Sequence, residues 1–488
     1  MTLAFPWGWK RDFMTTHLKL YTPLRQGAAD GRPQKAATAA EQLWKLLPLQ
    51  RKSITWVACL VLVVCAIFVS IDYTSQASIP PSADEHVEST RSESVASTEE
   101  VESRSESLSD VSPNSTQANV SSSATQDIGA PPPISDVTKL IDFSVGGCNI
   151  YRGDWIPNPD GPGYTNATCP FIQPNQNCLK NRRPDRGFLY WRWKPRDCEL
   201  PLFDAKDFLK RVRGKKWGFI GDSLARNNYQ SLICYLAQVE VPENTFNDGA
   251  DGNMRWYFKS YNFTLVVVWT PFLIKGTEDE ADGFPKNIAK LHVDVVDEVW
   301  APTLHEYDYI VLSGGHWYHR TSVYFIQNKP VGCNYCPHLN FTDVGFSFAY
   351  RRALRTVFDF LISSKYKGVV FFRTYSPEHY ENGLWNEGGN CNKTVPAKSK
   401  SIALDDRSME MYKIQLQEFG KTVQGSSKFS FKLKIVDGTR ATLLRPDAHP
   451  GPYGHDFHPM MRNDCVHWCL PGAVDTWSAM LQHVLKHL

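Results

Sequence analysis

Residues 215–238 predict a strand, a tight turn and a helix in direct succession. The strand-like run ends at Ile220, the tripeptide Gly221-Asp222-Ser223 follows, and the helix-like run begins at Leu224. A strand that leads straight into a helix is typical of the repeating unit of a parallel sheet. This stretch therefore indicates an α/β protein.

The rest of the carboxyl-terminal part repeats the alternation. Strand-like runs are predicted at residues 215–220, 263–269, 308–313, 368–373 and 431–436. Helical patterns are predicted at residues 224–238, 347–364 and 407–423, and a last helix carries Trp477, Met480, Leu481, Val484 and Leu485 on one face. This order predicts a three-layer α/β/α sandwich around a mostly parallel sheet.

Ser223 is a candidate nucleophile, because the turn puts it at the start of the following helix, beyond the carboxyl end of a strand. A serine hydroxyl needs an imidazole to take its proton, and that imidazole needs a carboxylate to fix its tautomer. The run Asp464-x-x-His467 supplies both groups from one short loop. We therefore predict a triad of Ser223, His467 and Asp464.

Gly-Asp-Ser is also ordinary turn chemistry, in which Gly and Asp are favoured for local backbone reasons. The late Asp-x-x-His segment favours the catalytic interpretation. A nucleophile early in the domain and Asp-x-x-His near its end is the chain order of SGNH, or GDSL-type, esterases. The chain resembles that class.

A closer resemblance covers residues 143–488. It rests on CNIYRGDW at 148–155, YWRWKP at 190–195, GDSLARN at 221–227, GHW at 315–317, RPD at 445–447 and DCVHWCLPG at 464–472. These motifs, in this order, resemble the plant trichome birefringence-like polysaccharide O-acetyltransferases. The resemblance implies an SGNH-like α/β/α fold with a disulfide-stabilised, aromatic-rich second lobe.

The resemblance also implies a reaction. An acetyl group would pass from a donor through a Ser223 acyl-enzyme to a hydroxyl of a wall polysaccharide, with xyloglucan favoured over xylan or mannan. The donor stays open between acetyl-CoA and another acetyl carrier, and neither a bound cofactor nor a nucleic-acid partner is expected. An acetyl esterase is the alternative, because water can attack the same acyl-enzyme. A polysaccharide-binding protein with an inactive triad is the third possibility.

A developing oxyanion needs hydrogen-bond donors. The backbone N–H groups of Ser223 and Gly315 are the predicted donors, while Ser313 stands where the family often has an Asn, so the side-chain donor stays open. The further candidates for oxyanion or substrate binding are Gly315, Arg226, Asn227, His316 and Trp317. Arg226 is equally well explained as a surface arginine, and Asn227 as the cap of a local turn.

Two other features have competing explanations. Aromatic residues are dense in segment 155–217, where core packing is preferred over sugar stacking for most of them. Cys333-x-x-Cys336-x-His338 imitates half a zinc site, and a His/Asp-rich run spans residues 447–458. Because no second pair has fitting spacing, no metal site is expected, and a disulfide or local hydrogen bonds are preferred.

The amino-terminal part predicts a membrane anchor. Residues 54–71 form an uncharged apolar run, long enough to cross a bilayer, after a 1–53 segment with nine Lys or Arg and three Asp or Glu. We predict a cytosolic tail at 1–53, a type II signal anchor at 54–71, an acidic Ser-rich stem at 72–142 and a lumenal domain at 143–488. A cleaved signal peptide is the alternative. The short span favours the Golgi membrane.

Cysteines and glycosylation sequons support a lumenal domain. Ten of the twelve cysteines follow the apolar run, and an even number past an anchor favours disulfides. The sequons are at Asn114, Asn119, Asn166, Asn262, Asn340 and Asn392. The resemblance implies the pairs Cys148–Cys198, Cys169–Cys234, Cys178–Cys469 and Cys391–Cys465, with four or five bridges in all.

Overall fold

The computed structural model describes residues 139, 141–249, 252–277, 288–425, 429–454 and 463–488. The predicted tail at 1–53, the predicted anchor at 54–71 and almost all of the predicted stem lie outside these residues. Among the residues that are described, no helix is long and apolar enough to cross a membrane.

A seven-stranded sheet forms the centre of the fold, with the strand order β13-β12-β9-β3-β6-β5-β4. Its strands, in chain order, are β3 (Lys216–Gly221), β4 (Glu243–Asn247), β5 (Met254–Phe258), β6 (Phe263–Trp269), β9 (Tyr309–Ser313), β12 (Val369–Arg373) and β13 (Lys432–Val436). β13, β12, β9, β3 and β6 run parallel, whereas β5 and β4 are antiparallel. The five parallel strands are the five that the apolar runs predicted.

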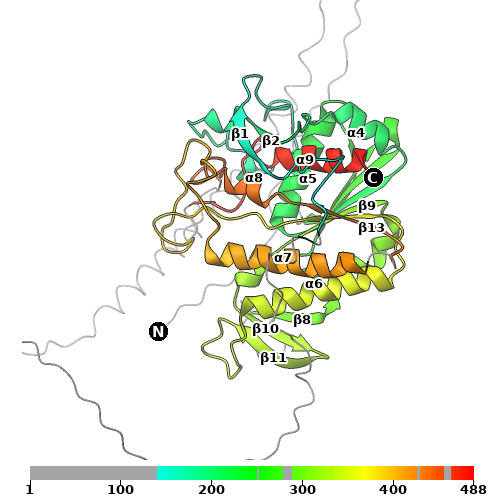
Figure 1. Ribbon diagram of the computed structural model, residues 1–488, viewed down its shortest axis with the longest axis vertical. Helices are drawn as coiled ribbons and strands as arrows, with labels where there is room; N and C mark the ends of the chain where they lie inside the picture. Colours follow the sequence, from blue (N-terminus) through cyan, green and yellow to red (C-terminus); the bar gives the residue numbers. More distant parts are fainter. Residues whose placement is uncertain (1–138, 140, 250–251, 278–287, 426–428, 455–462) are drawn as a thin grey trace, which may run out of the picture. The chain divides into compact units, whose positions relative to one another are not determined.

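Helices cover both faces of this sheet (Figure 1). One face carries α4 (Ala205–Arg211), α5 (Ser223–Ala237) and α9 (Asp475–Lys486), and the other carries α6 (Gly345–Ser363) and α7 (Asp406–Gln424). Along β3, Phe219 packs in the core shared with α5 and α9, and the next residue, Ile220, packs in the core shared with α6 and α7. Such alternation is what a strand buried on both faces requires. The predicted α/β/α sandwich is confirmed.

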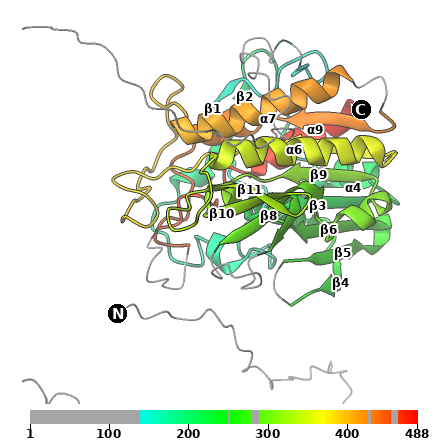
Figure 2. The same ribbon diagram turned by 90° about the horizontal axis from the view of Figure 1, so that it is seen from below.

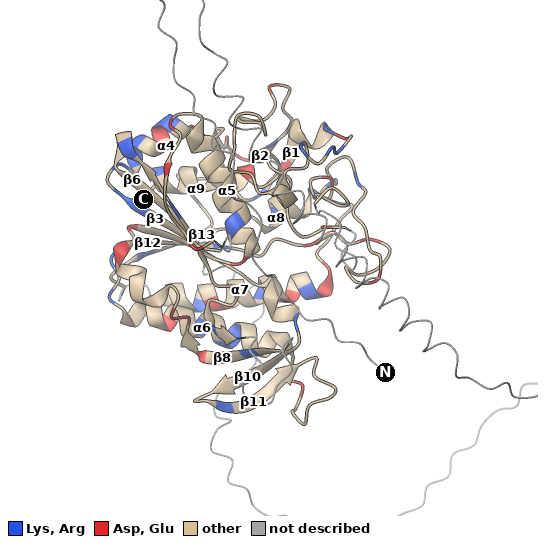
Figure 3. Ribbon diagram, turned by 180° about the vertical axis from the view of Figure 1, so that it is seen from behind, with Lys and Arg blue, Asp and Glu red and all other residues tan. Residues whose placement is uncertain are grey.

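The helices on the second face are joined by buried charges. The Glu418 carboxylate of α7 is 3% exposed and accepts hydrogen bonds from Arg351 and Arg355 of α6, each at 2.8 Å. Figure 3 shows residues of both charge signs along these two helices. The paired guanidinium groups compensate a carboxylate that would otherwise be costly to bury.

Two smaller sheets were not predicted. β1 (Gly153–Pro157) and β2 (Trp191–Pro195) form an antiparallel pair in the aromatic-rich amino-terminal segment, next to α8 (Thr439–Leu443). The other sheet has the order β11-β10-β8-β7 and lies against α6 (Figure 2). Its strands are β7 (Ile274–Thr277), β8 (Ala289–Val296), β10 (Ser322–Ile326) and β11 (Lys329–Asn334).

Five disulfides connect the described residues. Four are the pairs that the resemblance implied, Cys148–Cys198, Cys169–Cys234, Cys178–Cys469 and Cys391–Cys465. The fifth joins Cys333 to Cys336 in the four-stranded smaller sheet, which is one of the two alternatives to a zinc site that the sequence left open. Three predicted sequon asparagines, Asn262, Asn340 and Asn392, are exposed, and Asn166 is half-buried.

Candidate active site

The turn after β3 leaves Ser223 at the first position of α5. Gly221 pairs with Ser313 of β9 so closely that a Cβ atom on it would lie 1.8 Å from the Ser313 carbonyl oxygen, so only glycine fits. Asp222 is the N-cap, and its Oδ1 accepts hydrogen bonds from the backbone N–H groups of Leu224 and Ala225 at 2.9 and 3.4 Å. Gly221 and Asp222 therefore build the turn, and the Ser223 hydroxyl stays available for another partner.

That partner is His467. Its Nε2 lies 2.7 Å from Ser223 Oγ, and its Nδ1 lies 2.8 Å from Asp464 Oδ2. Asp464 is fully buried, whereas the His467 side chain is 18% exposed. The fold thus brings together all three residues predicted for the triad, although Ser223 and His467 are 244 positions apart in the sequence.

The carboxylate also sets the proton affinity of the ring. Burial opposes a charge on His467, but the adjacent Asp464, by its charge and its hydrogen bond, raises the pKa of His467 above its ordinary value. An Nδ1–H that donates to Asp464 leaves the Nε2 lone pair directed at the Ser223 hydroxyl. The arrangement can therefore remove the proton of that hydroxyl as it attacks a carbonyl carbon.

Covalent links hold the base loop on both sides of His467. Cys465 is bonded to Cys391, and Cys469 is bonded to Cys178. The N–H groups of Val466 and His467 donate to Asp464 Oδ1 at 3.2 and 2.9 Å, which closes the loop on its own carboxylate. A disulfide thus anchors the chain two residues before His467 and another anchors it two residues after His467.

Asn227 has a different role from the predicted one. It is fully buried, its Oδ1 accepts from the Trp468 backbone N–H at 2.9 Å, and its Nδ2 donates to Gln176 Oε1 at 3.0 Å and the Trp468 carbonyl at 3.4 Å. With these bonds made, its amide cannot reach a substrate. Asn227 instead fixes the residue next to the base. Trp468, also fully buried, is a core residue.

Two histidines that the sequence analysis did not single out as a pair support the same loop. His449 Nδ1 lies 2.6 Å from the His467 carbonyl oxygen, and its ring stacks on Trp468 with centroids 4.0 Å apart. His379 Nδ1 lies 2.7 Å from His449 Nε2, and the His379 backbone N–H donates to the Cys465 carbonyl. Burial lowers the pKa of both rings, to about 4 for His379. No sequence spacing connects these residues, so only the fold reveals them.

The loop after β9 corrects a second prediction. His316 Nε2 lies 2.8 Å from the Ser376 carbonyl, and its Nδ1 lies 3.1 Å from the Tyr375 hydroxyl, on whose ring it stacks. Both ring nitrogens thus already have partners within the protein, so neither is available as a hydrogen-bond donor to an oxyanion. Ser313 is buried, and its Oγ has no hydrogen-bond partner among the described residues. The side-chain donor to the oxyanion therefore stays open.

Comparisons with known proteins agree with this geometry. Residues 200–484 match the PC-Esterase family, which is described as a GDSL/SGNH-like acyl-esterase family found in Pmr5 and Cas1p. Residues 146–199 match the PMR5 N terminal domain. The chain belongs to the PC-esterase family. It is 42% identical over 365 residues to protein trichome birefringence-like 19 of Arabidopsis thaliana, covering 73% of this chain and 85% of that protein.

Two Populus trichocarpa relatives carry a functional name. Xyloglucan O-acetyltransferase 4 is 43% identical over 343 residues, and xyloglucan O-acetyltransferase 1 is 42% identical over 351 residues. Each match covers 70% of this chain and 81% of the relative. The resemblance to the trichome birefringence-like group is confirmed.

The amino-terminal family segment is part of the PC-esterase site's support. The Gln176 side chain accepts a hydrogen bond from Asn227, and its backbone carbonyl accepts one from the Leu470 N–H. Cys178 forms a disulfide with Cys469. Arg183 donates to the carbonyls of His449 and Asp447, both at 2.6 Å. Residues 146–199 therefore hold the base loop together with α5, which they also contact through Gln176 and Asn227.

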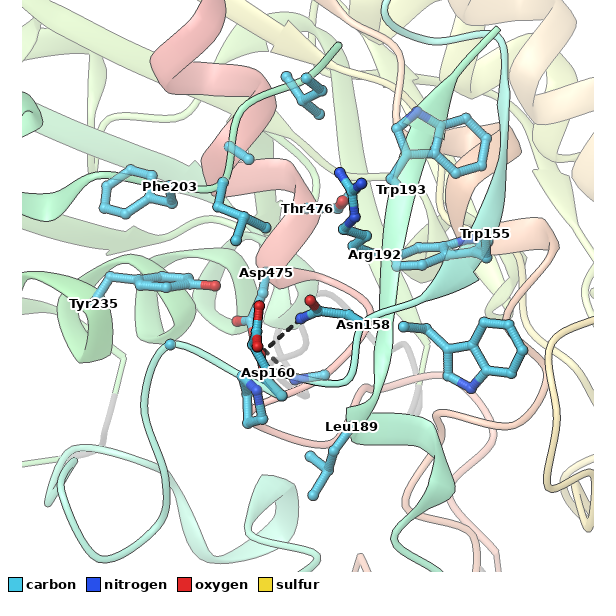
Figure 4. A pocket seen from close by; sticks show the side chains of 18 of the residues that line it. Trp155, Asn158, Asp160, Leu189, Arg192, Trp193, Phe203, Tyr235, Asp475 and Thr476 are labelled. Carbon is cyan, nitrogen blue, oxygen red and sulfur yellow. Dashed lines mark hydrogen bonds between the residues drawn. The ribbon is translucent and has the colours of Figure 1, made fainter.

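The same segment also lines a separate pocket of about 280 Å³ (Figure 4). Trp155, Trp191 and Trp193 of the β1–β2 pair, Asn158, Asp160 and Asp475 are among its lining residues, and Ser223, Asp464 and His467 are not. Asn158 donates to the Gly161 carbonyl at 2.7 Å. Aromatic residues of this segment thus line a pocket that is distinct from the triad.

The predicted His/Asp-rich run is only partly described. Asp447 forms a buried ion pair with Arg445 at 2.8 Å, and His449 binds His379 and His467 as above. His455, Asp456 and His458 lie outside the described residues. Within the part of the chain that is described, no group of three or more His, Cys, Asp or Glu could hold a metal ion.

Proposed function

We propose that this chain is an O-acetyltransferase that moves an acetyl group onto a hydroxyl of a plant cell-wall polysaccharide, with xyloglucan as the acceptor. The observation that carries the proposal is the 2.7 Å contact between Ser223 and a His467 held by buried Asp464. The names of the two Populus relatives support xyloglucan.

In the first half-reaction, Ser223 Oγ attacks the acetyl carbonyl carbon of the donor while His467 Nε2 takes the hydroxyl proton. The bond between the acetyl carbon and the donor's oxygen or sulfur breaks. The leaving atom receives the proton from His467, and the acetyl group is left as an ester on Ser223. Asp464 stays ionised and stabilises the imidazolium that forms between these events.

The oxyanion of the tetrahedral intermediate needs donors near Ser223. Ser223 opens α5 and Gly315 precedes the short helix at His316–His319, so both backbone N–H groups belong to helix beginnings that lack an intrahelical acceptor. We assign the oxyanion to these two N–H groups. His316 and Asn227 are excluded from this role by the bonds that they already make.

In the second half-reaction, His467 takes the proton of an acceptor hydroxyl, whose oxygen attacks the acetyl carbon. The Ser223 ester bond breaks, and Ser223 Oγ takes the proton back from His467. Water in place of the sugar would give hydrolysis by the same steps. A polysaccharide acetyl esterase is therefore the second candidate, and the acyl-esterase description of the matching family favours it.

We further propose that the protein is a Golgi type II membrane protein with residues 143–488 in the lumen, anchored through residues 54–71. The five disulfides and the three exposed sequon asparagines support an oxidising, glycosylating compartment. The acetyl donor is acetyl-CoA or another activated acetyl carrier.

The test incubates the purified full-length protein with a labelled acetyl donor and a panel of xyloglucan, xylan and mannan oligosaccharides. Label on the xyloglucan oligosaccharides, absent with Ser223→Ala, is the expected result. A parallel reaction with acetylated xyloglucan and no donor tests the esterase. Release of acetate there, with no transfer in the first reaction, would replace the proposal by hydrolysis. Transfer that survives Ser223→Ala would contradict the mechanism.

A further inference from the structure

The turn that carries Ser223 lies between the ends of two strands. Gly221 pairs with Trp269 of β6 on one side and with Ser313 of β9 on the other. Trp317 follows Ser313 by four residues, in the short helix His316–His319 that comes after β9. In a parallel sheet the carboxyl ends of neighbouring strands meet at one edge, where ligands bind. Trp269 and Trp317 therefore belong to the same edge as the nucleophile.

These two tryptophans contact each other edge to face, with ring centroids 5.4 Å apart and planes at 81°. The Arg226 guanidinium lies 5.0 Å from the Trp269 ring centroid, and that of Arg320 lies 4.5 Å from the Trp317 centroid. Arg226 is on α5, one helical turn after Ser223. All four side chains are partly exposed. They form a continuous surface, which we call the Trp–Arg surface.

Electrostatics connect this surface to the triad. The positive charge of Arg226 is close enough to oppose protonation of His467, although Asp464 outweighs it. Arg226 thus stands near both the nucleophile and the base.

We propose that the Trp–Arg surface binds the sugar ring of the neutral polysaccharide acceptor next to the acetylated hydroxyl. This inference rests on the proposed function. Indole rings supply flat apolar area for the C–H face of a pyranose, and guanidinium groups supply N–H donors for its hydroxyls. The four side chains are partly exposed, as contact with a long polysaccharide requires. The predicted role of Trp317 in substrate binding is kept, and Trp269 and Arg320 are added to it.

The two half-reactions depend differently on the Trp–Arg surface. The Trp–Arg surface acts on the acceptor, so its loss should weaken acceptor binding and leave acetylation of Ser223 by the donor unchanged. Trp317 is the residue to change, because it lies in the short helix His316–His319 outside the central sheet, whereas Trp269 ends a strand of that sheet. Trp317→Phe keeps an aromatic ring and should retain part of the affinity.

Binding is measured first, by calorimetry of an unacetylated xyloglucan oligosaccharide with full-length Ser223→Ala protein, which cannot turn over. Adding Trp317→Ala should raise the Kd about ten-fold, a loss of about 1.4 kcal/mol of binding free energy. The Kd of the Trp317→Phe variant should lie between those of the Trp317 and Trp317→Ala proteins. The matched control is Trp191→Ala, another partly exposed tryptophan that lines the separate pocket of Figure 4. It should change the Kd less than two-fold.

Kinetics are measured next, with Ser223 intact. Trp317→Ala should raise the acceptor KM by a similar factor while mass spectrometry finds the same rate of Ser223 acetylation. An unchanged Kd for Trp317→Ala, or a loss confined to Trp191→Ala, would overturn the inference. Slower Ser223 acetylation with an unchanged acceptor KM would also overturn it, because the surface would then bind the donor.

If wild-type protein transfers no acetyl group but Trp317 still governs oligosaccharide binding, the proposed function fails and this inference stands.

Discussion

Asp464 combines two tasks at the residue scale. One carboxylate oxygen accepts hydrogen bonds from the backbone N–H groups of Val466 and His467, and the other accepts one from the His467 ring. The carboxylate therefore shapes the loop and raises the pKa of the base at the same time. An amide in its place would keep the volume but lose the charge and one acceptor.

Asp464→Asn should lower kcat/KM by about four orders of magnitude, the scale of such a change in serine triads, and should shift its pH dependence. His467 must be neutral to accept the Ser223 proton, so activity falls as pH drops through the pKa of this ring. Asp464 raises that pKa, so its replacement should move the acid limb to lower pH. A pH–rate profile of both proteins checks this, and a limb that stays in place or moves to higher pH contradicts it.

Asn227 and Asn228 offer a matched comparison. Both are fully buried on α5, but Asn227 holds the Trp468 backbone, whereas the Asn228 amide has no hydrogen-bond partner among the described residues. Asn227→Ala leaves the Trp468 N–H unsatisfied, which should cost about 1–3 kcal/mol of unfolding free energy and reduce kcat. Asn228→Ala should affect kcat much less. Denaturant titration and kinetics measure both, and equal losses of kcat would refute the positioning role of Asn227.

At the scale of elements, the base loop depends on its two disulfides. The Cys391–Cys465 bridge closes 74 residues, which corresponds to about 4 kcal/mol in the chain-entropy estimate. The double variant Cys391→Ser, Cys465→Ser should lose most activity at temperatures where its circular dichroism is still native, because the loop is freed before the core melts. The double variant Cys333→Ser, Cys336→Ser removes a bridge of the smaller sheet and is the control. Similar activity losses in both would show that the bridges stabilise the fold without aligning the base.

The elements also show what sequence patterns reveal. The five parallel strands were predictable because four are short runs of mainly apolar residues and β13 alternates lysines with apolar residues before a turn. β4 was not, since all five of its residues are exposed and carry no apolar alternation. The triad was predictable from two local patterns, the turn between a strand and a helix at Ser223 and the Asp464-x-x-His467 spacing, because serine catalysis requires these residue types. The positioning roles of Asn227, His379 and His449 were not, because Asn227 meets Trp468 across 241 positions and His379 meets His449 across 70, contacts that exist only in the folded chain.

At the scale of the whole molecule, the amino-terminal family segment is part of one folded unit. Ile150, Tyr151 and Trp193 are buried in the same core as α5 and α9. Cys178 and Arg183 reach the base loop from this segment. A separable module would not share a core and a catalytic loop with its neighbour.

Truncation tests this integration. A fragment of residues 139–488 should fold and keep the activity of the full-length protein, because it holds both family segments and all five disulfides. A fragment of residues 200–488 should be inactive and unfold at a much lower temperature, because it lacks Cys178, Arg183 and part of the core. Thermal melts and transfer assays on both compare them. An active 200–488 fragment would contradict the account of the base loop's support.

The central claim is that Ser223 carries the acetyl group between donor and acceptor. Its most direct test is mass spectrometry of peptides from protein that has been incubated with the acetyl donor without acceptor and quenched rapidly. The account predicts one acetyl group on the peptide that contains Ser223, its disappearance when xyloglucan oligosaccharide is added, and no adduct on Ser223→Ala. Acetyl transfer at a normal rate by Ser223→Ala, or an adduct that the acceptor cannot discharge, would contradict it.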